Sequence, residues 1–456
     1  MAPKGPSKGK KFNPIDLTGS DDDDDDDDNN ASNNKLTWGV ELEFVYAFHE
    51  STVKLKPIYK DGEYHKTSLK KDASYSERAA VTTSRALNIQ RNSAGNVNYN
   101  SWLIQKEYNK ELEVYGEEVQ QILSQVLTKK CPGIKNRVQE KMEAEDKVEM
   151  YYNEWLVMSE KSICGVGSAN IPAWIPEVTS KTDWDSFGLE LASPIFESNS
   201  DQGYTEISKI LEATRGIAKA RFPAAFITNQ CGLHVHVQAP EDIKVLQELA
   251  WVIFVYEAQI ARLHPPCRRP MHPNAAYVVE SNRIRLLHQP DCTPNRYTYT
   301  TFDVSNDELI RTSYGIMRDT IHNREDAASL ATLMNAPVAR TDQNFMNVGN
   351  RNRQVNFTTA ARDKYFPCTI EFRQARGSLN PIVIRKWVEF CIGLVRVAQF
   401  YAENPNKFPV QEFDKNARNA DNKLLKTRIS IMDLMRDMGL VRKTKIFGRT
   451  GWRDSQ

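Results

Sequence analysis

Four short segments of the chain alternate apolar with ionisable residues, and they carry the side chains best suited to chemistry. They read VELEF at 40–44, GLEL at 188–191, LHVHV at 233–237 and IEFR at 370–373. Alternate residues of a β-strand point to opposite faces, so the ionisable residues of each segment share one face. We predict that these faces belong to one sheet. Its polar side then gathers Glu41, Glu43, Glu190, His234, His236, Glu371 and Arg373.

Clustered carboxylates point to a bound cation. Like charges in a confined site raise each other's pKa, so four carboxylates stay ionised near neutral pH only when cations neutralise them. Carboxylate-dominated sites suit Mg²⁺ or Mn²⁺, which keep coordination positions for water and substrate phosphates. The imidazoles shift the preference somewhat toward Mn²⁺. The pattern therefore predicts a site for Mg²⁺ or Mn²⁺.

Each pattern also has a purely structural interpretation. An E-x-E strand is most often the solvated face of an antiparallel sheet, and an H-x-H pair is most often exposed or hydrogen-bonded. Glu371 and Arg373 would then form a charge pair worth less than about 1 kcal/mol. A zinc or non-haem iron site of two His and one Glu is the closest chemical alternative, but it leaves the other carboxylates unused. The joint occurrence of the pairs favours a functional site.

The elements that must position these residues are strands joined by helices. Residue content predicts strands at 36–48, 187–196, 231–237 and 367–375. Helical periodicity predicts two helices between 101 and 159, broken at CPG (131–133), and further helices at about 205–220, 240–263 and 381–404. Asn380 is the expected N-cap of the last helix, with Pro381 in its first position.

Polar residues at alternating strand positions disfavour a parallel sheet that is buried on both faces. We therefore predict an α+β fold: one mostly antiparallel sheet with helices on one face and an open polar face. We expect a domain over 36–403 with a helical insertion at about 101–160, and a C-terminal extension over 404–456.

Residues 1–35 form a tail that we predict to be disordered, because eight adjacent aspartates repel one another too strongly to pack. Ile15, Asp16 and Leu17 precede the acidic run Asp21 to Asp28, which resembles a motif that binds the modifier SUMO by adding a strand to its sheet. A solubilising acidic tail is the alternative. Lys8, Lys10 and Lys11 form a weak candidate for a nuclear-import patch.

Composition sets further limits. The net charge is +1 and the first 30 residues carry −5, which leaves +6 for the remainder, too weak and dispersed to indicate nucleic acid. No apolar run approaches the roughly 20 residues of a membrane span, and no secretory signal precedes the fold. The seven scattered cysteines predict buried free thiols. We therefore expect an intracellular protein, cytoplasmic or nuclear.

The ordered set WGVELEF, GLELASP, CGLHVHV and TIEFR resembles the putative amidoligases of the carboxylate-amine ligase superfamily, which includes glutamine synthetase. The resemblance extends from about residue 36 to about 400. WLVMSEKSI at 155–163 is similar to the Trp-containing strand of the family, with Glu160 where an Asp is usual. PPCRRP and RNRQVNF are similar to its Arg-bearing segments.

The resemblance implies a glutamine-synthetase-like curved half-barrel that binds ATP and at least two Mg²⁺ ions, with outer helices. By motif position, Glu43 and Glu190 ligate one ion, and Glu41, His234 and Glu371 ligate the other. His236 lies near the phosphates, Arg353 and Arg373 neutralise the transferring phosphate, and Asn356 helps to position substrate. The polar loop before residue 101 and the charged segment after it have no family counterpart, so the amine and acid substrates stay open.

Three functions compete on this sequence. The first is an ATP-dependent ligase that joins an amine to a carboxylate of a peptide or small molecule through an acyl phosphate. The second is an inactive ligase fold that acts as a binding or scaffold protein recruited through its SUMO-binding-like tail. The third is a His/His/Glu metallohydrolase, whose activity needs no nucleotide.

Overall fold

The computed structural model describes thirteen stretches of the chain: 35–49, 119–139, 152–160, 163, 171–176, 178, 184–215, 223–269, 281–283, 307–335, 353–361, 367–409 and 430–440. The acidic tail with its SUMO-binding-like motif and the polar loop before residue 101 lie outside these stretches. Most of the region after residue 409 also lies outside them.

One sheet organises the described residues. Its strands are β1 (Thr37–His49), β2 (Asn136–Val138), β3 (Trp155–Ser159), β4 (Trp184–Ala192), β5 (Phe196–Glu197), β6 (Ala224–Phe226), β7 (Gly232–Gln238), β8 (Val355–Asn356) and β9 (Thr369–Arg376). Their order is β2-β3-β4-β1-β7-β9-β8, with β5 and β6 also paired to β1. All pairs are antiparallel except β2 with β3. The path of strands ends at β2 and β8, so the sheet is not closed.

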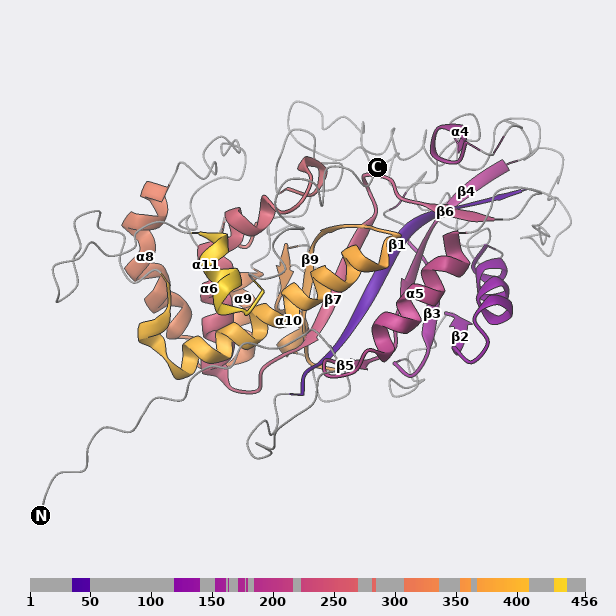
Figure 1. The fold of residues 1–456 in the computed structure, drawn as a ribbon. Coiled ribbons are helices and arrows are strands. Elements are labelled where there is room, and N and C mark those ends of the chain that lie inside the picture. The colour runs from indigo at the N-terminus through magenta and orange to yellow at the C-terminus, as the bar shows by residue number, and fades with distance from the viewer. Residues whose placement is uncertain are drawn as a thin grey trace, which may run out of the picture.

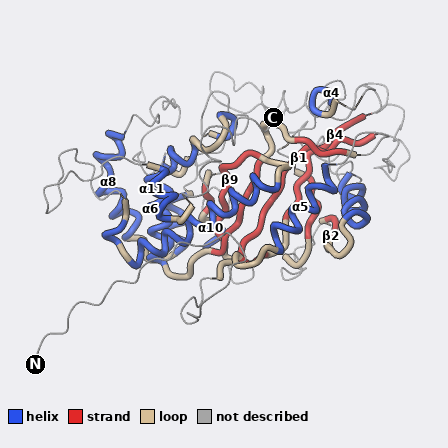
Figure 2. Tube along the Cα trace, viewed as in Figure 1, coloured by secondary structure: helices blue, strands red, loops and turns tan. Residues whose placement is uncertain are grey.

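Helices cover one face of this sheet (Figures 1 and 2). They are α5 (Gln202–Arg215), α6 (Ile243–Ala261) and α10 (Pro381–Glu403), with a further helix over 119–130. The helices α8 (Asp307–His322), α9 (Ala327–Met334) and α11 (Ile431–Asp437) contact α6. The short helix α4 (Ile171–Trp174) lies on the other face, where Ile171 packs with Val45 and Ala47 of β1. Short 3-10 turns are η5 (Pro266–Arg268), η8 (Thr358–Ala361) and η9 (Pro405–Lys407). Asn380 caps α10 by accepting a hydrogen bond from the Ile382 amide at 3.0 Å, which confirms that start.

The apolar positions of the central strands form the floor of the core. Val40, Leu42 and Phe44 of β1 join the same buried cluster as Val235 of β7 and Phe372 of β9. This cluster also contains the apolar sides of α6 and α10, which pack on each other, and α10 contacts β7. Because side chains alternate along a strand, burying these positions turns the intervening ionisable ones to the opposite face. The α+β fold with a mostly antiparallel sheet is confirmed.

One prediction was wrong in part. We expected two helices between residues 101 and 159. The described residues of this segment, 119–139 and 152–160, contain one helix, at 119–130, and residues 140–151 of the second expected helix lie outside them. Asn136–Val138 is instead the edge strand β2, and Trp155–Ser159 is β3, which lies between β2 and β4. These strands are too short to show a period, and β3 pairs with β4, which lies outside the segment that was read for periodicity.

The structure tests two expectations about the whole chain, and it tests them only for the described residues. Within them, no helix is long and apolar enough to cross a bilayer. Five cysteines fall in the described stretches and all five are free thiols, four of them buried.

Candidate functional site

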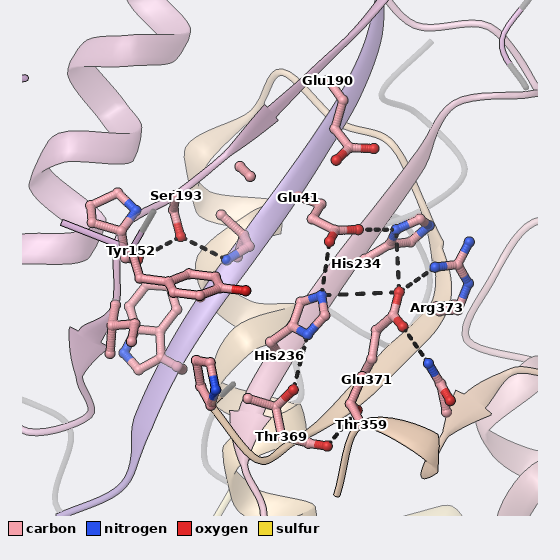
Figure 3. A pocket seen from close by; sticks show the side chains of 18 of the residues that line it. Glu41, Tyr152, Glu190, Ser193, His234, His236, Thr359, Thr369, Glu371 and Arg373 are labelled. Carbon is pink, nitrogen blue, oxygen red and sulfur yellow. Dashed lines mark hydrogen bonds and ion pairs between the residues drawn. The ribbon is translucent and has the colours of Figure 1, made fainter. Parts of the chain in front are cut away.

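The register of the central strands makes the predicted residues direct cross-strand neighbours. Glu43 is paired with Glu190 across β1 and β4, and Glu41 with His234 across β1 and β7. His236 is paired with Glu371 across β7 and β9, and Asn356 of β8 with Glu371 from the other side. All of them line one pocket of about 490 Å³ over the polar face of the sheet (Figure 3).

Three of these residues form what we call the mixed group: Glu41, His236 and Glu371. Each offers one ligand atom, and these atoms lie within 4.8 Å of one another. His236 Nε2 lies 3.1 Å from Glu41 Oε1 and 4.0 Å from Glu371 Oε1. The other ring nitrogen of His236 lies 3.2 Å from the Thr369 hydroxyl, which fixes the plane of the ring. Two carboxylates and one imidazole at this spacing suit Mn²⁺ or Mg²⁺.

A second set, which we call the acidic group, consists of Glu43, Glu160 and Glu190. Its ligand atoms also lie within 4.8 Å of one another. Glu43 and Glu190 are buried, although glutamate side chains are rarely buried unless they have a partner. Three carboxylates without an imidazole are the oxygen-only donor set that hard divalent cations prefer.

His234 lies between the two groups rather than in either. Its Nδ1 is 2.7 Å from Glu41 Oε2 and 3.7 Å from Glu371 Oε1, while its Nε2 is 3.4 Å from Glu43 Oε1. Both ring nitrogens therefore face carboxylates. The sequence assigned His234 to the ion held by Glu41 and Glu371, and its Nδ1 does lie near both carboxylates. His236 also lies near both, so the structure places two imidazoles beside these carboxylates.

Proton affinities differ between the two groups. Burial raises the pKa of Glu190 well above its usual value, and Glu41, Glu160 and Glu43 raise it further by repulsion. Burial alone would also raise the pKa of Glu371 and of Glu41. For Glu371, Arg373 and His236 outweigh that effect and lower its pKa. For Glu41, His236 and His234 do the same and bring its pKa well below its usual value. The acidic group thus suits an added cation, while the mixed group is already partly neutralised.

The acidic group is held close to the backbone at Gly232. The Gly232 amide donates a hydrogen bond to Glu43 Oε2. A Cβ atom at this position would lie 2.8 Å from Arg268 Nη2, 2.8 Å from His234 Nε2 and 2.9 Å from Glu43 Oε2. Only glycine leaves room for these three side chains to meet.

A β-bulge lies at Arg373, whose side chain is on the same face of β9 as Glu371 and lines the pocket. Leu233 is paired with Ala375 and Val235 with Phe372, so β9 has one residue more than β7 between these pairs. A bulge redirects side chains and leaves backbone groups outside the ladder. Here the Arg373 carbonyl accepts a hydrogen bond from Arg268 Nη2 at 2.9 Å, and the Arg373 side chain forms an ion pair with Glu371.

The remaining predicted residues lie in different places. Asn356 is in the pocket, and its side-chain amide donates to Glu371 Oε2 at 2.7 Å. Arg353 is buried outside the residues that line the pocket, and its Nη1 donates to the Ser281 carbonyl at 2.8 Å.

Sequence reasoning did not assign site roles to four residues that the structure brings here: Glu160, Arg268, Thr369 and Tyr152. Glu160 directly follows β3, and Arg268 ends η5, so both belong to segments that were noted without a role. Thr369 begins β9 two residues before Glu371, on the same face, and its spacing could have identified it. Tyr152 precedes β3 in a loop and gave no such signal.

Comparison with known proteins supports one assignment. A family described as putative amidoligase enzyme matches residues 34–395, which include every strand of the described stretches and both ligand groups. No curated protein matches the chain, and no solved structure matches it. Since the match covers most of the chain, this protein belongs to the amidoligase family.

Proposed function

We propose that the protein is an ATP-dependent ligase that joins a carboxylate to an amine, with Mg²⁺ or Mn²⁺ as cofactor. The carrying observation is that two groups of metal-ligand side chains lie side by side in one pocket of an amidoligase-family chain. The family supplies the reaction class. The donor sets support the cations, because carboxylate-rich groups suit ions that also bind phosphates.

The reaction needs the carboxylate to be activated, because an oxide or hydroxide is a poor leaving group when an amine attacks. Transfer of the γ-phosphoryl of ATP to the acid gives an acyl phosphate, whose phosphate then leaves as the amine nitrogen bonds to the carbonyl carbon. Divalent cations bound here would neutralise charge on the phosphate oxygens.

The side chains of this chain would divide the work. The mixed group would hold one cation and the acidic group the other, with His234 keeping Glu41 and Glu43 apart. Arg373, which forms an ion pair with Glu371, would stabilise the charge that develops on the transferring phosphoryl group. Asn356 would fix the orientation of Glu371. The glutamine-synthetase-like curvature of the sheet remains part of this proposal.

The test is ADP release by the purified protein with ATP, Mg²⁺ and panels of candidate acids and amines. Glu41→Gln and Glu371→Gln keep the size of the side chain and remove a ligand charge, so each should abolish release. Glu241→Gln, which changes an exposed residue outside the pocket, is the matched control and should leave release unchanged.

Metal-dependent ADP release that persists in both pocket variants would overturn the proposal. Metal-dependent hydrolysis of a substrate in the absence of any nucleotide would point instead to the metallohydrolase alternative.

A further inference from the structure

The pocket has two unlike ends along β1. Glu43 marks one end, beside Glu190 and Glu160, and Glu41 lies in the middle. The other end, which we call the neutral end, contains no charged residue among those of the described chain that line the pocket. It is lined by Thr37, Tyr152, Pro194, Ile195, Pro367 and Thr369. From Thr37 to Glu43 a strand covers about 20 Å, so the pocket suits an extended ligand.

The neutral end is a built surface. Ser193 accepts a hydrogen bond from the Val40 amide at 2.8 Å and donates one to the Pro194 carbonyl at 2.8 Å, which fixes the chain as it leaves β4. The Ile195 amide then donates to the Tyr152 carbonyl at 3.0 Å. This backbone hydrogen bond therefore holds Ile195 and Tyr152 next to each other at one rim of the pocket.

Two of these side chains present accessible apolar surface at the pocket. The exposed fraction of Ile195 is 44%, and Tyr152 is only half-buried. Figure 3 shows the ring of Tyr152 extending from beside Ser193 toward the middle of the pocket. An exposed isoleucine next to a ring in a concave site is suited to cover a flat apolar ligand.

The charges of the reactants indicate which of them binds at the neutral end. The acid is ionised, the amine is protonated in water, and the triphosphate is strongly negative, so each of these groups is expected at the charged part of the pocket. The nucleoside is uncharged, and its base has apolar faces. We propose that the neutral end binds the nucleoside of ATP, with the base against the Tyr152 ring and Ile195 over its edge. This inference rests on the proposed function and assigns one part of that substrate to one part of the site.

The test compares ATP with inorganic triphosphate, which carries the charges without the nucleoside. Calorimetric titrations of both in Mg²⁺ should show tighter binding of ATP to the unmodified protein. Tyr152→Ala should weaken ATP binding about tenfold or more, because aromatic stacking on a base has that magnitude, and should leave triphosphate binding unchanged. Tyr152→Phe keeps the ring and should retain the ATP affinity.

A second pair of variants controls for loss of fold. Ile195→Ser should weaken ATP binding less than Tyr152→Ala does. Ile382→Ser changes an isoleucine of α10 that is 61% exposed and does not line the pocket, so it should have no effect.

The outcomes separate this inference from the proposed function. ATP and triphosphate binding with equal affinity, or both weakened equally by Tyr152→Ala, would overturn the nucleoside assignment and leave the ligase proposal standing. A Tyr152→Ala effect confined to the KM of the acid substrate would overturn it as well. Failure of the unmodified protein to bind either compound would overturn both.

Discussion

The mixed group and the acidic group have the same number of ligand side chains but different sources of neutralising charge. In the mixed group, Arg373 forms an ion pair with Glu371 and the imidazole of His236 contacts Glu41. In the acidic group, Glu190 faces other carboxylates, and its pKa is raised by burial and by that repulsion. Protein side chains thus already compensate the charge of the mixed group, whereas for the acidic group we expect a bound cation to do so.

Among the effects that distinguish the two groups, the largest is expected from removing the guanidinium of Arg373, which forms an ion pair with Glu371 of the mixed group. Arg373→Gln should lower ADP release by about 10²–10³-fold, the usual cost of losing one preorganised charge that stabilises a transition state. Assays at saturating Mg²⁺ measure it. Arg385→Gln, on α10 in an ion pair with Glu389, is the control and should retain activity. Release within twofold of the unmodified protein would show that Arg373 only balances Glu371.

The next effect concerns the glycine against which the acidic group packs. Gly232→Ala places a methyl group within 2.9 Å of three buried side-chain atoms, so it should lower the free energy of unfolding by about 1–3 kcal/mol. It should also weaken Mn²⁺ binding, measured as the metal-dependent rise in melting temperature. Gly315→Ala in α8 has nothing within 4 Å of the added atom. It should stabilise the protein by up to about 1 kcal/mol, and equal effects at the two glycines would refute the packing argument.

A smaller effect, of opposite sign in the two groups, is expected in metal-free protein. Glu190→Gln replaces a carboxyl whose ionisation is opposed by burial and by the neighbouring carboxylates with a neutral amide, and it should raise the melting temperature by about 2 °C. Glu371→Gln leaves Arg373 without its carboxylate partner and should lower the melting temperature. Thermal unfolding with a chelator, and again with Mg²⁺, measures both. The idea that the acidic group depends on a cation fails if Glu190→Gln is destabilising without metal.

The smallest expected effect concerns a His–Glu pair outside the pocket, which serves as a reference for the pairs inside it. His322 Nε2 lies 2.8 Å from Glu248 Oε1. Burial lowers the pKa of His322, but the hydrogen bonds to Glu248 and to the Arg318 carbonyl, together with the charge of Glu248, outweigh it and raise that pKa above 6.5. A raised pKa means that the pair stabilises the fold fully below the unfolded-state pKa, and that this contribution is lost as pH rises through the folded-state pKa.

The free energy of unfolding of the unmodified protein should therefore exceed that of His322→Gln by more at about pH 6 than at about pH 9. Urea unfolding at the two values measures the difference, and Mg²⁺ should not change it. A difference that grows with pH would reverse the assigned sign.

Period-two patterning was enough to predict the polar face, because alternation along one strand is a local property. It placed Glu41, Glu43, His234, His236 and Glu371 in one pocket before any pairing was known. It could not distinguish His234 from His236 as the third member of the mixed group. Both imidazoles lie near Glu41 and Glu371, and the register that places His236 opposite Glu371 is a property of two strands.

Other parts of the fold could not be predicted from the sequence for the same reason, because they depend on a neighbouring strand. β8 has two residues and β2 has three, too few to show any period, and both exist because a neighbour offers backbone partners. Arg353 precedes β8, and nothing in its own segment shows that its side chain lies outside the pocket lining. Glu160 was noted only through its family motif, since it follows the last residue of β3.

The central position of β1 has a consequence for biosynthesis. This strand pairs with β4, β5, β6 and β7, and Glu41 meets His234 across 193 positions of the chain. β1 is therefore synthesised long before its partners. Until they have been synthesised, the strand is unpaired and its apolar side is exposed. Contacts of such long sequence separation slow folding and favour aggregation of the nascent chain. Among the described strands, the first to be translated is thus the one that most needs protection until β7 and β9 have been synthesised.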